Sequence, residues 1–165
     1  MNFAMDSIAC HPIAFVRSRF SSTQGMPIQT VAAQDEEGVI ELRPEFEPGL
    51  QGIEGFDFLI LITRLHGVRQ ESLQVTPFLD DQVHGVFATR APARPNKLGL
   101  SIVKLLRREA GKLHFSGNDM LDGTPVLDIK PYVPAFDVRQ TDRVGWYADK
   151  IRNLPNTRSD DRMGR

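Results

Sequence analysis

The chain has 165 residues, of which 41% are hydrophobic and 25% are charged, and its formal net charge is -1. These are ordinary values for a globular protein, so they exclude a fibrous or wholly disordered chain and predict one compact domain. The single cysteine, Cys10, excludes an intramolecular disulfide and a cysteine-cluster metal site, and we expect it to be a small buried hydrophobe. No apolar run is long enough to span a membrane and no signal peptide is recognisable, which predicts a cytoplasmic protein without a membrane partner.

The first half of the chain alternates short predicted strands with irregular segments. Apolar residues alternate over 8–17, which predicts a strand, whereas 19–34 has no clean period and predicts a long loop. A short strand is expected over 38–43, and the following segment is broken by glycine and proline, with room for one helical turn. The stretch FDFLILITR, residues 56–64, is the best candidate for a buried strand.

The second half continues the same pattern. Further strands are predicted over residues 83–89, 100–106, 112–116 and 126–132. The apolar residues of 100–106 would also lie on one face of a helix, but the length of this segment and the flanking Gly99 and Gly111 favour a strand. Six or seven strands separated by turns are typical of an all-β barrel or sandwich. Val144, Tyr147, Ile151 and Leu154 have helical spacing, which predicts a helix over 141–154, and a polar, frayed tail is expected over 156–165.

Charge is unevenly distributed along the chain. Eight acidic residues and one basic residue lie between Asp35 and Asp57, whereas six basic residues and no acidic one lie between Gly85 and Arg108. A cluster of one sign can hold a phosphate-bearing partner, although a solvated protein surface would give the same pattern.

Common catalytic motifs are absent from the sequence. There is no GxGxxG after a strand, no phosphate-binding P-loop, no HExxH and no GxSxG. The four histidines lack metal-ligand spacing, so no metal site is predicted. Ser101 is interpreted as a strand residue rather than a nucleophile.

Three polar segments at strand ends remain: the loop near Gln29, residues 90–96, and SGNDMLDGT at 116–124. Pro92 and Pro95 fix the backbone and remove two hydrogen-bond donors, so the second segment is a pre-ordered loop rather than a central strand. An arginine fork in such a loop suits an anion or a planar ligand. Asp122 precedes Gly123 and could simply form a turn.

Two long stretches, VFATRAPARPNKLGLSIVKLL and LHFSGNDMLDGTPVLDIKPYVPAFD, resemble the TsaA-like β-barrel family (YaeB, VirR-like, TrmO-type). Its characterised members are S-adenosylmethionine-dependent tRNA N6-methyltransferases. IAFVRSRF, GLQGIEGFDFLILITRLH and GWY match the family in the same order. The resemblance implies a mostly β, single-domain antiparallel barrel over residues 1–155, with long connecting loops and a short C-terminal helix, acting as a homodimer. The implied reaction is methyl transfer to N6 of threonylcarbamoyladenosine at position 37 in the tRNA anticodon loop.

The resemblance also implies roles for individual residues. Arg94, Asn96 and Lys97 are assigned to the acceptor base or its phosphate, and no metal ion is implied. A sulfonium methyl group is already activated, so catalysis is expected to rest on alignment and desolvation, with Asp122 or His66 as the candidate base for the N6 proton. Contacts to S-adenosylmethionine are implied for Gln29, Thr30, Val31, His66, Gly67, Arg90, Ile102, Asp119, Met120, Leu121 and Asp122.

The chain departs from the family pattern at several places. Gln29-Thr30-Val31 replaces a glutamine-proline-glycine triplet, RPNKLG replaces RPNPIG, and residues 74–84 replace a segment rich in proline and glycine. The longer bacterial members also carry a C-terminal domain beyond the region that resembles this chain. These differences bear on the acceptor more than on the cofactor. Two alternatives follow: a methyltransferase of this fold with a different acceptor, or a cofactor-binding regulatory module without turnover.

Overall fold

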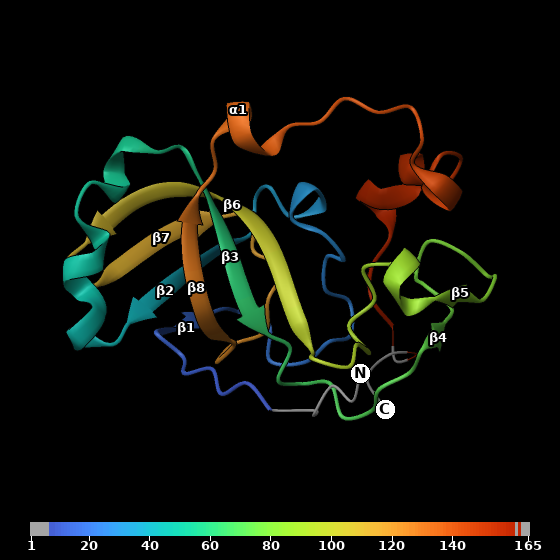
Figure 1. Cartoon of the computed structure of the whole chain (residues 1–165), viewed down its shortest axis with the longest axis horizontal. Coiled ribbons are helices and arrows are strands. Elements are labelled where there is room, and N and C mark those ends of the chain that lie inside the picture. Colours follow the sequence, from blue (N-terminus) through green and yellow to red (C-terminus); the bar gives the residue numbers. More distant parts are fainter. Residues whose placement is uncertain (1–6, 161, 163–165) are drawn as a thin grey trace, which may run out of the picture.

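The computed structural model describes residues 7–160 and 162. Six antiparallel strands close into a barrel in the order β1-β2-β7-β6-β3-β8 (Figure 1), which confirms the predicted mostly β, single-domain antiparallel barrel. The barrel strands are β1 (Ala14–Arg17), β2 (Glu37–Leu42), β3 (Phe58–Arg64), β6 (Leu98–Glu109), β7 (Lys112–Ser116) and β8 (Pro125–Pro131). A separate two-stranded sheet pairs β4 (Gln74–Val75) with β5 (His84–Gly85).

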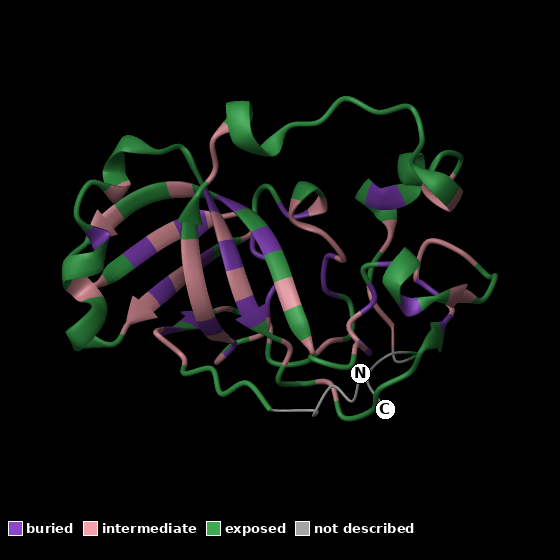
Figure 2. Ribbon diagram, viewed as in Figure 1, coloured by how far each residue is buried: buried purple, intermediate pink, exposed green. Residues whose placement is uncertain are grey.

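The alternating sequence pattern produces the barrel core. In β3, Leu59, Leu61 and Thr63 are buried while the residues between them turn outward, as a strand period of two requires (Figure 2). The same alternation in the other strands gives one apolar interior that includes Ile40 and Phe115, both fully buried. The barrel therefore encloses packed side chains rather than a channel.

Strand β6 is the longest strand and joins two sides of the barrel. Its first part pairs with β3, from Leu98 to Lys104, and its second part pairs with β7, from Lys104 to Glu109. A register shift between Leu105 and Arg107 bends the strand where it changes partner. Sequence patterning identified the middle of this strand but not its full length, because its second half is mostly solvent-exposed and polar.

Short helices fill the connections between strands. The broken segment after β2 forms two 3-10 helices, η2 (Pro44–Leu50) and η3 (Ile53–Gly55), and Leu50 packs against the barrel core. A third, η1 (Thr30–Ala32), lies in the first long loop, and a single α-helical turn, α1 (Pro134–Asp137), follows β8.

The C-terminal part of the chain corrects one detail of the prediction. Residues 141–154 do not form a continuous helix but contain the 3-10 helix η5 (Gly145–Tyr147) and the start of η6 (Ile151–Asn156). Gly145 adopts a left-handed φ of 59°, which a continuous helix does not allow. The apolar residues with helical spacing line a cavity instead of forming a helical stripe over the barrel.

Two further expectations are wrong. The strand predicted over 83–89 is limited to β5, because the chain turns into the 3-10 helix η4 (Val86–Ala88) directly afterwards. Cys10 is an exposed free thiol rather than a buried hydrophobe, because β1 begins only at Ala14 and residues 7–11 before it are exposed.

Candidate functional site

A cavity of about 850 Å³ lies beside the barrel. One wall comes from the barrel strands, through residues such as Thr63 and Ser101, and another from the first long loop and the segment that follows β3. The C-terminal segment, residues 144–160, supplies much of the remaining wall, and Figure 1 shows it near the β4–β5 sheet, connected to the barrel by the chain that follows β8. The cavity volume is in the range of small-molecule sites.

The polar residues of the cavity come from distant parts of the sequence. Arg90, after η4, donates a hydrogen bond from Nη1 to Oε1 of Gln29 over 3.1 Å. His66 and Gly67, directly after β3, lie on the same cavity. Arg90 is exposed, so its remaining guanidinium hydrogens are available to a ligand.

Asp119 carries a carboxylate of the cavity that is bonded to a barrel strand. The Ser101 hydroxyl donates to its Oδ1 over 2.8 Å. Burial raises the pKa of Asp119 to about 6, and the hydrogen bond from Ser101 and the charge of Arg90 oppose this rise only in part. The site therefore holds an acid whose ionisation changes close to neutral pH.

Asp119 is positioned by a tightly bonded loop, residues 117–124, which we call the Asn118 loop. Asn118 is fully buried; its Nδ2 donates to Ser18 Oγ over 2.7 Å, and its Oδ1 accepts from Met120 N over 3.1 Å. Gly117 starts the loop with a left-handed φ of 88°. Met120 packs into the barrel core, so both neighbours of Asp119 are fixed.

Asp122 stabilises the other side of the Asn118 loop. Its Oδ1 accepts a hydrogen bond from Ser18 N over 3.0 Å, and its own N–H donates to Phe20 O over 2.8 Å. The side chain is exposed and does not line the cavity. The structure thus gives Asp122 the turn-forming role and places Asp119 in the cavity.

Arg94 lines the cavity but holds its own loop together. Its Nη1 lies 3.1, 2.9 and 3.4 Å from the carbonyl oxygens of Val86, Thr89 and Ala91. Asn96 is exposed outside the cavity lining, and Lys97 forms an ion pair with Glu71 at 3.7 Å. The three residues assigned to the acceptor thus lie in different environments.

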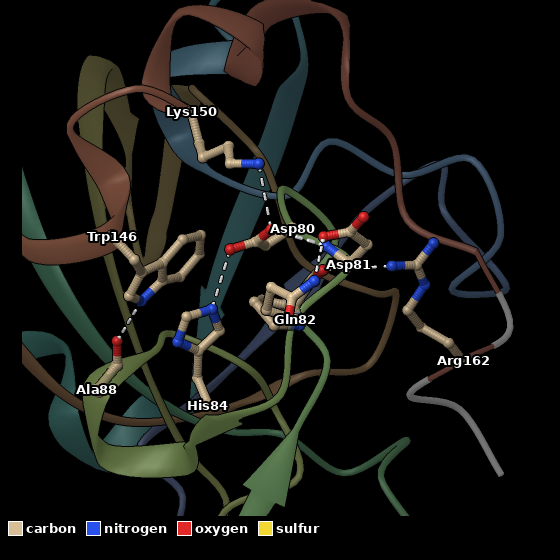
Figure 3. A network of polar contacts seen from close by, with 9 residues as sticks. Asp80, Asp81, Gln82, His84, Ala88, Trp146, Lys150 and Arg162 are labelled. Carbon is tan, nitrogen blue, oxygen red and sulfur yellow. Dashed lines mark hydrogen bonds and ion pairs between the residues drawn. The ribbon is translucent and has the colours of Figure 1, made fainter.

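The C-terminal segment is attached to the loop between β4 and η4 by a cluster that we call the clasp: Asp80, His84, Trp146 and Lys150 (Figure 3). Asp80 contacts His84 Nε2 at 3.0 Å and Lys150 Nζ at 3.2 Å. Trp146 stacks on His84 with 4.7 Å between ring centroids, and its Nε1 donates to Ala88 O over 2.8 Å. The hydrogen bond to His84 is the largest cause that holds the pKa of Asp80 well below its usual range. The clasp fixes this wall of the cavity.

The region expected as a polar tail also contacts the first long loop. Ser159 N donates to Met26 O over 2.9 Å, and Gly25 N donates to Ser159 O over 2.8 Å. Residues 161 and 163–165 of that tail lie outside the described residues.

Some predicted site residues meet at the cavity and others do not. Thr30 and Ile102 do not line it, and Ile102 lies on the exposed face of β6. Asn96, Lys97 and Asp122 are also absent from the lining. The residues that the structure brings together there are Gln29, Val31, His66, Gly67, Arg90, Arg94, Asp119, Met120 and Leu121.

Sequence reasoning missed Ser101 and the aromatic residues Trp146 and Tyr147 as parts of the site. A hydroxyl at an inward position of an apolar strand needs a hydrogen-bond partner, and that requirement could have indicated Ser101. The aromatic pair, 3.9 Å between ring centroids, was hidden because a helical stripe was expected there.

Charge pairing removes much of the predicted basic cluster. Arg108 pairs with Glu54 at 3.1 Å, so the acidic and basic stretches partly neutralise each other, and Arg107 pairs with Glu109 at 2.7 Å. Across residues 7–160 and 162, no group of three or more potential metal ligands comes together. Over the same residues, no helix has the length and apolarity to cross a membrane.

The closed barrel and its ligand-sized cavity, with convergent polar groups in a largely apolar wall, define a small-molecule-binding β-barrel protein. The model of the tRNA-methyltransferase O N-terminal domain matches residues 15–138, and the chain belongs to this family.

Known relatives align with most of the length of this chain. A probable S-adenosyl-L-methionine-binding protein of Pyrococcus abyssi is 47% identical over 156 residues, which cover 94% of this chain and 85% of the relative. The human tRNA (adenine(37)-N6)-methyltransferase is 34% identical over 141 residues, 81% of this chain but 32% of the human protein. The crystal structure of TrmO from P. aeruginosa superposes with a TM-score of 0.74 at 40% identity and covers 89% of this chain. This chain spans 64% of that TrmO chain.

Proposed function

We propose that the protein is an S-adenosylmethionine-dependent methyltransferase that methylates N6 of threonylcarbamoyladenosine at position 37 of tRNA. The observation that carries the proposal is the cavity, where Gln29, Arg90 and Asp119 converge in a member of the tRNA-methyltransferase O family. The names of the Pyrococcus and human relatives support the cofactor and the acceptor, respectively.

The residues present fit this cofactor chemically. The cavity has room for a nucleoside with an amino-acid side chain, and Met120 and Leu100 give it apolar surface. Asp119 forms no ion pair among the described residues, so its carboxylate can face a cationic group. Arg90 can donate to a carboxylate, and Gln29 and the backbone after β3 can bond to a base or ribose.

When bound, the cofactor supplies an electrophilic methyl group on a sulfonium sulfur. The protein's own contribution is alignment and exclusion of water. The clasp and the contacts of Ser159 hold the C-terminal segment in the cavity wall, and the Asn118 loop fixes Asp119. Pre-set geometry of this kind accounts for much of the rate gain in a reaction whose electrophile is already activated.

The resemblance implies a homodimer, and the outer face of β3 and β6 is the proposed contact surface. Leu98, Leu100 and Ile102 alternate along β6 and are exposed, and Ile60 and Ile62 lie opposite the last two on β3. Leu98 and Leu100 also line the cavity. A second copy on this face would cover an apolar patch and border the cavity. Since tRNA is the acceptor, we propose the cytoplasm as the place of action.

Transfer of a labelled methyl group tests the function. The expected result is incorporation into tRNA that carries threonylcarbamoyladenosine and none into the same tRNA without that modification. Incorporation into another fraction would favour a different acceptor. Tight cofactor binding by calorimetry without transfer to any RNA would favour a regulatory module.

Two variants separate cofactor and acceptor contacts. Arg90→Ala should weaken cofactor binding about tenfold or more, as expected from the loss of charge-assisted hydrogen bonds, with little change in folding. Asn96→Ala should lower turnover with cofactor affinity nearly unchanged. Arg139→Ala is a matched control, because Arg139 is exposed and, among the described residues, its side chain bonds only to the adjacent Val138 carbonyl. Unchanged kinetics in both site variants would refute the assignment.

A further inference from the structure

The cavity presents one carboxylate that has a single side-chain donor. Asp119 Oδ1 accepts from the Ser101 hydroxyl, the Asp119 N–H also favours the ionised carboxylate, and no other side chain donates to it among the described residues. Arg90 is the charged group whose field reaches Asp119, but one of its nitrogens is bonded to Gln29. Arg94, His66 and Asp160 also line the cavity, and Arg94 is engaged with backbone carbonyls. The carboxylate is therefore held but not neutralised by a direct ion pair.

Its orientation is set from two sides. Ser101 is 6% exposed and lies on β6, opposite Leu61 of β3, so its hydroxyl is anchored in the barrel wall. The Asn118 loop fixes the backbone of Asp119 from the other side, through the fully buried amide of Asn118. A carboxylate on a well-bonded loop, held by a hydroxyl from a barrel strand, can point at a reacting atom without reorganisation.

The two sequence candidates for a base are less suitable. Asp122 points to the Ser18 backbone and lies outside the cavity lining. His66 lies on the cavity but is exposed, with no side-chain hydrogen bond to orient it among the described residues.

We propose that Asp119 is the catalytic base of the methyl transfer and that Ser101 is the positioning residue that fixes its carboxylate. This inference rests on the proposed function. The N6 nitrogen forms a bond to the methyl carbon while the carbon–sulfur bond breaks, and the sulfur leaves as a neutral thioether. The N6 proton passes to Oδ2 of Asp119, and the resulting carboxylic acid returns it to water.

The ionisation of Asp119 suits this role. Burial raises its pKa to about 6, so at pH 7 the ionised form outnumbers the acid about tenfold. A base whose pKa lies close to the working pH combines basicity with availability. The Ser101 hydrogen bond favours the ionised form, so its loss should raise the pKa of Asp119 further.

The test is a pH–rate profile of single-turnover methyl transfer with saturating S-adenosylmethionine and modified tRNA. The wild-type rate should rise about tenfold per pH unit below the pKa that Asp119 has in the complex, which the positive charge of the cofactor lowers from its ligand-free value, and level off above it. Asp119→Asn should lower the plateau about 10²- to 10⁴-fold. Ser101→Ala should move the inflection to higher pH, and Ser101→Thr, which keeps the hydroxyl, should move it back. Asp128→Asn, on β8 outside the cavity lining, is the matched carboxylate control.

A carbon-13 NMR titration of the Asp119 carboxyl, without cofactor or tRNA, gives an independent readout. Its midpoint should lie near pH 6 and rise in Ser101→Ala. A midpoint near the ordinary value of about 4 would overturn the role of Asp119 as base but leave the proposed function standing. The same conclusion would follow if Asp119→Asn kept the wild-type rate and inflection. Loss of cofactor affinity in Asp119→Asn with an unchanged plateau would reduce Asp119 to a binding residue and also overturn its role as base. Absence of transfer by the wild-type protein would overturn the proposed function and the inference together.

Discussion

Replacing Arg94 with alanine should destabilise the protein, although sequence reasoning assigned this residue to the acceptor. Its guanidinium bridges the carbonyl oxygens of Val86, Thr89 and Ala91, so it ties η4 to the segment that carries Arg90. Phe87 lies beneath the guanidinium, 5.9 Å from it to the ring centroid.

The geometry sets the expected size of the effect. Nη1 has two hydrogens, so it makes two good hydrogen bonds, at 2.9 and 3.1 Å, and the third contact at 3.4 Å is weak. Hydrogen bonds to charged groups contribute about 1.5–3 kcal/mol each. Arg94 is half-buried, so water can replace part of the loss, and we expect Arg94→Ala to lower the free energy of unfolding by about 2–3 kcal/mol. For a chain of this length, that loss corresponds to a decrease in Tm of about 4–12 °C.

Urea denaturation and thermal unfolding measure this directly. Arg139→Ala is the control and should change the free energy of unfolding by less than about 0.5 kcal/mol. Arg94→Lys should recover only part of the loss, because an ammonium group cannot match the planar fork. If Arg94→Ala unfolds like the wild type but transfers methyl groups poorly to tRNA, the structural role is refuted and Arg94 belongs to the acceptor site.

Three other substitutions probe the walls of the cavity. Asp80→Asn should remove an acid sensitivity of the clasp. The pKa of Asp80 is lowered in the folded state, so its ionised carboxylate stabilises the fold above about pH 4, and this stabilisation is lost as the pH falls below that value. The fluorescence of Trp146 can follow the loss. Trp146→Ala should make the C-terminal segment sensitive to limited proteolysis, because the variant loses two ring stacks and a hydrogen bond that together stabilise the segment by about 2–4 kcal/mol. Trp146→Phe keeps a ring and should lose only about 1 kcal/mol of this stabilisation. Asn118→Ala should lower the free energy of unfolding by about 2–4 kcal/mol and weaken cofactor binding, because the Met120 N–H is left without its buried acceptor.

Each of these three predictions has a control variant or a result that would contradict it. Asn153→Ala, at an exposed position, should leave denaturation unchanged, in contrast to Asn118→Ala. A fluorescence titration of Asp80→Asn that still shows the wild-type transition would place the acid sensitivity elsewhere. Proteolysis of Trp146→Ala at the wild-type rate would show that the clasp does not hold the C-terminal segment.

The barrel was largely predictable because its strands carry a local signal. The run from Phe58 to Arg64 and the short strand β7 follow the burial alternation closely, so period and composition located them. The strand predicted over 83–89 is shortened to β5, because the apolar residues that follow belong to a 3-10 turn and to a small separate cluster that contains Val86. The local pattern of apolar residues does not distinguish a strand from a 3-10 turn of this kind.

The site was only partly predictable, since its geometry depends on contacts between distant segments. The resemblance identified Asp119 and Arg90, which meet at the cavity, but sequence could not tell Asp119 from Asp122, three residues away. The distinction depends on which carboxylate Ser18 occupies, a contact across 104 residues. Trp146 was likewise assigned to a helix because its partners, His84 and Ala88, are far away in the chain.

The C-terminal segment is synthesised after the strands of the barrel. The barrel is complete once β8 has been made, but residues 144–160, which form much of the cavity wall, follow later in the chain. Because domains can fold while translation continues, a nascent chain can reach a closed, packed barrel before its binding site exists. Newly made molecules would then resist unfolding before they can hold a ligand, and ligand-assisted folding could act only on the last step, when the C-terminal segment docks.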